Sequence, residues 1–350
     1  MSAEAAPGRD TAFAQTIVFV PTLRCPLRCL HCVTESGPDV RREMKPEDAE
    51  RWIDGLAATG RVRRLVLSGG EPFVDLARLD AILEAASGRD LAVSAVTSAS
   101  WAPTPERARR VLESRPALSE ICVSVDRWHL EFLSLGNARH AIEAAVALGR
   151  RSTVFATEAP ADGSVVASLR ASLDPAVASR LEIRREPLHF AGRARGAGAS
   201  ALAPHIAWGP LEAAVEGPCT GPAAPAVLPD GTVLACCGDA ISAPEEWTAL
   251  VLGSLATESA ESILARADAN PLLHAIRLLG PKALLLKARE LGAASGGREY
   301  ERDNICDTCR DLAAGGATRA RLRPWLEAET GSLGLARAAV LGEGWPEGDP

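Results

Sequence analysis

The sequence predicts an α/β fold, and two observations lead to it. Between residues 15 and 190, short β-rich runs alternate with helical stretches rich in Ala, Leu and Arg, and after residue 190 this alternation stops. Strands that alternate with helices indicate a parallel sheet with crossover helices. Six such repeats fit either an open doubly wound sheet or an incomplete α/β barrel.

Each predicted strand is a short apolar run rich in β-branched residues. The six runs span 16–21, 64–70, 91–98, 120–126, 152–158 and 181–190. Among the predicted helices, the one over 45–60 has the clearest signals for a helix start and a helix end. Pro46 suits a first turn, Glu47 and Asp48 favour the helix dipole there, and Gly60 suits the end.

The second half of the chain predicts a smaller domain. Residues 196–214 are rich in Gly, Ala and Pro and indicate a linker, and Asp230-Gly231 between two short β runs predicts a hairpin. Helices are expected over 258–268 and 271–295, then a loop containing "NICDTC" (304–309), then a helical tail with a loose end at 342–350.

Composition excludes several classes of function. The chain has 350 residues, 47% hydrophobic and 24% charged, which predicts a globular fold. A net charge of −7 argues against a nucleic-acid partner. Neither a secretory signal nor a membrane span is expected. We therefore expect a cytoplasmic protein whose nine cysteines are reduced and, where clustered, bind metal rather than form disulfides.

Three cysteines follow the first predicted strand in "RCPLRCLHC" (24–32), namely Cys25, Cys29 and Cys32. Active sites of α/β folds lie at this end of a parallel sheet. Three thiolates from one loop can bind three irons of a four-iron cluster and leave the fourth open. Zinc is the alternative, although its structural sites favour paired Cys-x2-Cys knuckles, and simple packing of small apolar residues is a third.

The second predicted strand ends in "SGGEP" (68–72). Two glycines let a ligand approach the backbone closely, and Glu71 offers a carboxylate to an ammonium group. On its own this pattern also fits a plain turn.

Together, the CxxxCxxC loop and the GGEP motif resemble the radical S-adenosylmethionine (radical SAM) superfamily. The resemblance implies a partial (βα)6 TIM-like barrel in which Cys25, Cys29 and Cys32 hold a [4Fe-4S] cluster. S-adenosyl-L-methionine would bind the open iron and be cleaved reductively to a 5'-deoxyadenosyl radical, which abstracts a substrate hydrogen.

The same resemblance implies a set of cofactor-binding residues. Gly69, Gly70 and Glu71, followed by Pro72, would bind the methionine amino group, and Ser124 and Asp126 resemble contacts to the ribose or carboxylate. "TSAS" (97–100) stands where many relatives have Thr-Asn-Gly, so a ribose role for Ser98 is less secure. His31 precedes the third cysteine and either covers the adenine or packs.

The later cysteines resemble SPASM/Twitch auxiliary-cluster domains. Cys219-x11-Gly-x4-Cys236 and then Cys306-x2-Cys309 match that pattern, and no cysteine follows. The resemblance implies one auxiliary [4Fe-4S] cluster bound by Cys219, Cys236, Cys306 and Cys309, with structural zinc as the alternative. Cys237 adjoins this set and is an alternative ligand, a packing residue or a hydrogen-atom donor. Cys122, inside a strand, is predicted to be a small core residue.

Further candidates lie near the expected barrel mouth. His129 is a candidate base in the loop after strand four. Arg184 and Arg185 alternate on the sixth strand, so one of them should point inward, and Arg185 is the candidate cofactor contact. The arginines of "GRARG" (192–196) are expected in a solvated turn.

The predicted organisation is a flexible N-terminus (1–14), the radical SAM barrel (15–195), a linker (196–214), a Twitch/SPASM-like domain (215–312) and a helical tail (313–350). The first hypothesis for function is modification of a ribosomally synthesised peptide, by epimerisation or a C–C or C–S crosslink. The alternative is dehydrogenation or rearrangement of a small metabolite such as an amino sugar or alcohol. A flavodoxin- or ferredoxin-type protein is the expected reductant.

Overall fold

The computed structural model describes residues 13–158, 165–293 and 297–341. Most of the predicted N-terminus, the loose end at 342–350 and the last residues of the helix predicted over 271–295 lie outside these ranges. The chain divides into two compact units. One contains residues 18–207 and 227–232, and the other contains residues 1–17, 208–226 and 233–350. The predicted domain boundaries stay predictions.

Six neighbouring strands form the centre of the first unit, in the order β1-β2-β3-β4-β5-β6. They are β1 (Thr16–Thr22), β2 (Arg64–Gly69), β3 (Ala92–Thr97), β4 (Leu118–Ser124), β5 (Arg151–Glu158) and β6 (Glu182–Pro187). The pairs β2–β3, β3–β4, β4–β5 and β5–β6 are parallel. The six predicted strands and the α/β class are confirmed.

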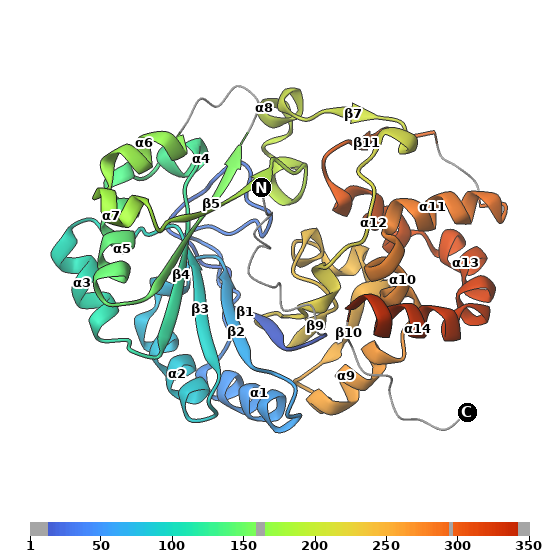
Figure 1. The fold of residues 1–350 in the computed structure, drawn as a ribbon, viewed down its shortest axis with the longest axis horizontal. Coiled ribbons are helices and arrows are strands. Elements are labelled where there is room, and N and C mark those ends of the chain that lie inside the picture. The colour runs from blue at the N-terminus through green and yellow to red at the C-terminus, as the bar shows by residue number, and fades with distance from the viewer. Residues whose placement is uncertain (1–12, 159–164, 294–296, 342–350) are drawn as a thin grey trace, which may run out of the picture. The chain divides into compact units, whose positions relative to one another are not determined.

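Helices connect these strands, and the longer ones cover the outer side of the sheet (Figure 1). They are α1 (Pro46–Ala58), α2 (Leu76–Ser87), α3 (Pro105–Glu113), α4 (Arg127–Leu130), α5 (Leu135–Ala147), α6 (Val165–Ser172) and α7 (Pro175–Ala178). Helix α1 begins at Pro46 as predicted and buries Trp52, Ile53 and Leu56 against its neighbours. Strand residues such as Leu65 and Ile121 are fully buried, which fixes the faces of the sheet.

The chain after β6 contains a short helix and apolar side chains that pack beside the cysteine loop. Helix α8 (Ala199–Leu202) lies there, and Leu202 is buried in an apolar cluster with Leu27, Trp128 and Leu188. This cluster also includes Cys29 and packs against Cys25 and Cys32. Residues 188–206 therefore belong to the packing around the cysteine loop, because their apolar side chains are covered by it.

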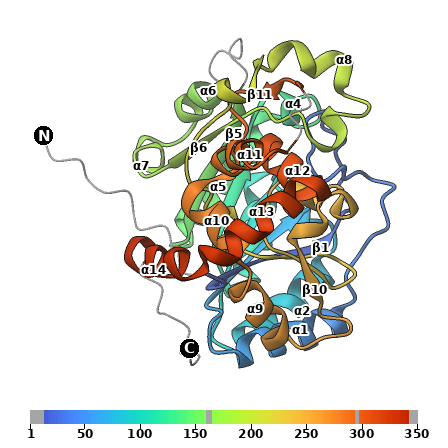
Figure 2. The same ribbon diagram turned by 90° about the vertical axis from the view of Figure 1, so that its right-hand side faces the viewer.

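The second unit is built mainly from C-terminal helices, which pack against one another (Figure 2). They are α9 (Ala260–Asp268), α10 (Pro271–Leu279), α11 (Pro281–Glu290), α12 (Ile305–Ala314), α13 (Gly316–Ala328) and α14 (Thr330–Leu341). Its short strands are β7 (Trp208–Gly209), β10 (Val251–Ser254) and β11 (Tyr300–Glu301). Strands β8 (Ala226–Val227) and β9 (Thr232–Leu234) form the predicted hairpin.

Two predictions for this unit are wrong. The single helix expected over 271–295 is two helices, because Gly280 has a φ of 83° and a Cβ there would lie 1.8 Å from the carbonyl oxygen of Gly217. Pro281 then starts α11, as proline does at a first helical turn. The loop expected around "NICDTC" is instead the start of α12, where the side chain of Asn304 caps the helix by accepting from the N–H of Cys306 at 2.9 Å.

Candidate active site

The three cysteines of residues 24–32 lie in the loop between β1 and α1. Cys29 is buried, and Cys25 and Cys32 are half-buried. The loop is held by its own backbone, since the N–H of Cys25 donates to Gly37 at 3.1 Å and that of Cys32 donates to Cys29 at 3.1 Å. All three cysteines line a cavity of about 300 Å³. Three thiol side chains therefore share one open space.

The cavity lies at the carboxyl ends of the parallel strands. Ser68, Ser98, Ser124 and Thr157 line it from the ends of β2, β3, β4 and β5, as do Gly69 and Gly70. Sequence reasoning missed Ser68 and Thr157, although their places at strand ends were a usable signal. It also missed Thr34 and Ser36, which follow the third cysteine and line the same cavity. Hydroxyl groups of this kind can bind a polar ligand without adding charge.

Gly69 and Gly70 bring the GGEP segment against the start of the cysteine loop. The N–H of Gly70 donates to Thr22 at 2.8 Å, and the N–H of Glu71 donates to Arg24 at 2.9 Å. A Cβ on Gly70 would lie 2.3 Å from the Arg24 carbonyl oxygen. Glycine is thus required here because a side chain would collide with the chain's own backbone. This holds whether or not a ligand also approaches the two residues.

The carboxylate of Glu71 is fully buried and already occupied. Its Oε1 accepts from the N–H of Phe73 at 3.2 Å and the hydroxyl of Thr97 at 2.8 Å, and its Oε2 accepts from the N–H of Ser98 at 2.9 Å and from the Ser98 hydroxyl. Burial raises the pKa of Glu71 despite these bonds. The structure therefore uses this side chain to join the loops after β2 and β3.

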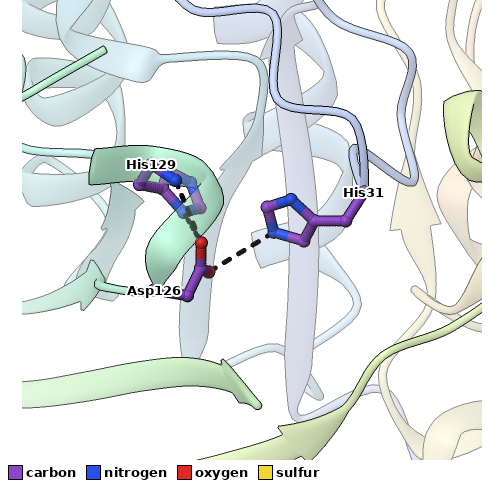
Figure 3. Close-up of side chains that lie close together, drawn as sticks. All are labelled: His31, Asp126 and His129. Carbon is purple, nitrogen blue, oxygen red and sulfur yellow. Dashed lines mark hydrogen bonds and ion pairs between the residues drawn. The ribbon is translucent and has the colours of Figure 1, made fainter. Parts of the chain in front are cut away.

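Asp126 joins two histidines, as Figure 3 shows. Its Oδ1 accepts from the N–H of His129 at 3.0 Å and lies 2.8 Å from the His129 Nδ1, and its Oδ2 lies 3.4 Å from the Nε2 of His31. Burial alone would raise the pKa of Asp126, but the hydrogen bonds from His129 and His31 hold it below its ordinary value.

His31 is held between aromatic side chains. Its ring stacks on the buried Trp128 at a centroid distance of 4.8 Å and meets the His129 ring edge-on at 5.2 Å. Its Nδ1 is buried and has no hydrogen-bond partner among the described residues. His31 and His129 both line the cavity, so the histidine pair forms part of its wall.

The structure does not bring every candidate to the cavity. Arg185 lies exposed on β6, and Arg184 is also exposed there and pairs with Glu182 at 2.8 Å. Pro72 is buried at the start of a short 3-10 turn. Cys122 is buried in β4, as predicted, and burial raises its pKa to about 12.

Burial affects the thiols of Cys25 and Cys29. Burial raises the pKa of Cys25 to about 12, although a backbone hydrogen bond and the charge of Arg193 act in the opposite direction. Burial also raises the pKa of Cys29, and the neighbouring Cys32 and Asp126 add to the effect. Without a metal these two thiols are protonated at neutral pH, so metal binding at this loop must release protons.

Residues 19–152 match the sequence profile of the Radical SAM superfamily. The chain contains a radical SAM domain. The match includes the cysteine loop, the GGEP segment and His129, and the family implies a [4Fe-4S] cluster and S-adenosylmethionine. The three clustered thiols beside an open cavity fit such a group.

One curated relative, "GTP 3',8-cyclase" of Heliobacterium modesticaldum (strain ATCC 51547 / Ice1), is 41% identical over 69 residues. That match covers 18% of this chain and only 21% of the relative's length. Together with the match of residues 19–152 to the superfamily profile, it indicates an enzyme.

Two solved structures show the extent of the structural likeness. Streptococcus suis SuiB bound to precursor peptide SuiA is 13% identical, with a TM-score of 0.52 over 84% of this chain and 76% of that one. BtrN in complex with AdoMet and 2-DOIA is 14% identical, with a TM-score of 0.42 over 76% of this chain and 85% of that one. The SuiB likeness confirms the predicted fold class of the radical SAM domain.

A second group of cysteines lies in the other unit. Cys219 precedes β8, Cys236 follows β9, and Cys306 and Cys309 lie in the first turns of α12. A Cβ on Gly238 would lie 3.1 Å from the Sγ of Cys306 and 3.9 Å from that of Cys236. A Cβ on Gly221 would lie 3.4 Å from the Sγ of Cys219. Segments distant in sequence thus bring these thiols together.

Burial raises the pKa of all four thiols in this second group, to about 12 for Cys236. The buried carboxylate of Asp239 adds to the effect at Cys306. Asp239 in turn accepts from the Asn304 side chain at 3.3 Å. Cys237, the remaining candidate, is exposed beside Cys236.

In the described part of the chain, a single group of three or more His, Cys, Asp or Glu side chains has its ligand atoms close enough to share one ion. That group is His31, Asp126 and His129, with the atoms within 4.8 Å of one another. No cysteine belongs to it. The described residues also include no helix that is long and apolar enough to cross a membrane.

Proposed function

We propose that Cys25, Cys29 and Cys32 hold a [4Fe-4S] cluster and that the adjoining cavity binds S-adenosylmethionine. The observation that carries this proposal is the placement of three thiols from one loop along one wall of a cavity at the strand ends. A protein that offers three thiolates to a four-iron cluster leaves one iron for another ligand. When bound, this pair supplies a 5'-deoxyadenosyl radical by one-electron reductive cleavage of the sulfonium.

Different residues of the domain bind different parts of the cofactor in this proposal. The main-chain groups of Gly69 and Gly70 face the cavity and accept the amino group of the cofactor, while Ser98 and Ser124 offer hydroxyls to its polar parts. For Glu71 and Asp126 we propose a different role from the predicted contact with the cofactor. Their oxygens are occupied by protein donors, so we assign them to positioning the walls.

We further propose that Cys219, Cys236, Cys306 and Cys309 hold an auxiliary [4Fe-4S] cluster. Thiolates around one zinc ion lie about 3.8 Å apart, because the zinc–sulfur distance is about 2.3 Å and the geometry is tetrahedral. No three thiols of the described residues are gathered to a single-ion spacing. A wider four-iron cluster suits this arrangement better than zinc does.

A ribosomally synthesised peptide is the proposed substrate class, modified by epimerisation or by a C–C or C–S crosslink. The support is the likeness of the fold to SuiB, which was solved with a precursor peptide. A small metabolite is the second candidate, supported by the sequence match to a GTP 3',8-cyclase. Electrons would come from a flavodoxin- or ferredoxin-type protein.

The test of the cofactor proposal is anaerobic reconstitution with iron and sulfide, followed by reduction and measurement of 5'-deoxyadenosine. We expect the wild-type protein to form it and the Cys29→Ala variant to form none. Cys122→Ala is the matched control, because Cys122 is an equally buried thiol in the same unit and should leave formation unchanged. A reconstituted wild-type protein that yields no 5'-deoxyadenosine would contradict the proposal.

The substrate class is tested by sequencing the genes beside this one and incubating a synthetic copy of each short peptide that they encode with the reduced enzyme in deuterated water. A peptide that gains one deuterium indicates epimerisation, and a loss of two hydrogens indicates a crosslink. Under the epimerisation proposal, Cys237→Ala abolishes deuterium uptake but keeps the iron content. Turnover of a small metabolite and of no peptide would favour the second candidate.

A further inference from the structure

The turn after β6 lies directly against the cysteine loop. The main-chain N–H of Arg193 donates to the carbonyl of Cys32 at 3.1 Å. Its guanidinium donates through Nη1 to the carbonyl of Cys29 at 2.7 Å and through Nη2 to the carbonyl of Ser36. One residue thus binds three carbonyls of the loop, two of them belonging to candidate iron ligands. The expectation that this arginine is solvated is wrong.

The backbone of this turn is shaped for the contact. Gly192 has a φ of 52°, and a Cβ there would lie 2.3 Å from the carbonyl oxygen of Val33 and 2.6 Å from that of Cys32. The N–H of Gly198 donates to the carbonyl of Arg193 at 2.7 Å and closes the turn. A Cβ on Gly198 would lie 2.9 Å from the carbonyl of Leu30. The approach therefore depends on residues without side chains.

The contact matters because the cysteine loop has little regular structure of its own. Its thiols can be fixed relative to one another only if the carbonyls between them are fixed. A planar guanidinium is suited to this, since it offers several donors in a rigid fork, and hydrogen bonds from a charged donor are stronger than neutral ones. The positive charge of this guanidinium lies 2.7 Å from the carbonyl oxygen of Cys29, one of the candidate iron ligands.

We propose that Arg193 is a positioning residue that sets the spacing of Cys25, Cys29 and Cys32 before iron binds and places a positive charge beside the bound cluster. The inference rests on the proposed cluster site at these cysteines. It goes further by assigning a part of the site to a residue about 160 positions away in the chain.

The first experiment uses the metal-free protein, so that it does not depend on cluster binding. Amide hydrogen exchange is measured across residues 24–37 in Arg193→Ala, Arg193→Lys and Arg195→Ala. Arg195 is the matched control, because it is an exposed arginine of the same turn whose side chain bonds the carbonyl of Phe190. We expect exchange about tenfold faster in Arg193→Ala, partial recovery in Arg193→Lys and wild-type exchange in Arg195→Ala.

The second experiment follows the reconstituted protein. Iron should dissociate about tenfold faster from Arg193→Ala than from wild type. The cluster potential should fall in Arg193→Ala and stay close to wild type in Arg193→Lys, because lysine keeps the charge but not the fork. Thermal unfolding of each variant separates a local effect from a failure to fold, and Arg193→Lys carries the test if the alanine variant does not fold.

Failure of the Arg193 proposal can be distinguished from failure of the cluster proposal. Wild-type exchange and wild-type iron retention in Arg193→Ala would overturn the role of Arg193 while leaving the cluster proposal intact. If instead the wild-type protein binds no iron at this loop, the proposed function fails, and the exchange experiment still decides whether Arg193 orders the loop.

Discussion

The two groups of cysteines in this protein differ in how the chain assembles them. Cys25, Cys29 and Cys32 come from one short loop and line a cavity, whereas the second group comes from three segments that are distant in sequence. Their charged neighbours also differ. The first group lies near charges of both signs, namely the carboxylates of Glu71 and Asp126 and the guanidinium of Arg193, whereas the buried carboxylate of Asp239 acts on Cys306.

This difference shows how two groups of cysteines in one protein can suit different functions. A loop that offers three thiols beside a cavity leaves room for a further ligand, so it suits a catalytic cluster. Four thiols brought together by folding suit a closed group that stores or passes an electron, and a neighbouring carboxylate lowers the potential of such a group. Both assignments are proposals, and the following predictions can separate the two groups.

The largest expected effect is a reciprocal loss of iron. The Cys29→Ala variant should lose about four irons per chain and all 5'-deoxyadenosine formation, because its cluster loses one of three ligands. The Cys306→Ala/Cys309→Ala double variant should lose about as much iron but still form 5'-deoxyadenosine. Iron analysis and product measurement check both, and equal loss of product in the two variants would contradict independent roles.

Gly70→Ala should have the next largest effect, confined to the first group. Its Cβ would lie 2.3 Å from the Arg24 carbonyl oxygen, so the cysteine loop must move. We expect destabilisation of about 1–3 kcal/mol in thermal unfolding, with reduced iron at the first group alone. Gly88→Ala is the control, since Gly88 has an ordinary helical conformation and no contact closer than 3.6 Å.

Asp126→Asn should loosen the histidine pair. The amide cannot accept from both His31 and His129, so a buried donor loses its partner at a cost of about 1–3 kcal/mol. We expect a lower unfolding temperature and slower 5'-deoxyadenosine formation, with the second group's iron unchanged. Activity equal to wild type would show that Asp126 does not position the cavity wall.

The smallest expected effect is a pH dependence at Glu71. Its pKa is raised in the folded state above the ordinary value of 4.5, so the folded protein binds a proton more readily than the unfolded chain. The contribution of Glu71 to the free energy of unfolding therefore falls as the pH rises above 4.5.

Glu71→Gln removes this titration, and its amide cannot accept from all the donors that meet the carboxylate. We expect the variant to be less stable than wild type at pH 4.5, with the difference shrinking as the pH rises. Unfolding of metal-free protein between pH 4.5 and 8 measures it, with Glu84→Gln, an exposed glutamate of α2, as control. A difference that grows with pH would show that the pKa is lowered instead.

Much of the radical SAM domain was predictable because its signals are local. The strands β1 to β6 were found from short β-branched runs, and α1 from Pro46 and its acidic first turn. The cysteine spacing and the GGEP motif pointed to the cavity that the structure contains. Reasoning from the local sequence failed at two residues. Gly280 interrupts a helix that was predicted to be continuous, and Asn304 starts a helix where a loop was predicted.

The sequence by itself determined where the cysteines cluster along the chain and that six strands form a parallel sheet. The tertiary structure alone decided which of the remaining polar groups are available to contact a ligand. Glu71 and Asp126 have the chemistry of ligand contacts, but their oxygens are occupied by Ser98 and His129. Arg193 reaches Cys29 across 164 positions of sequence. Such pairings form only when the sheet brings its strand ends together, so no periodicity or spacing within one segment records them.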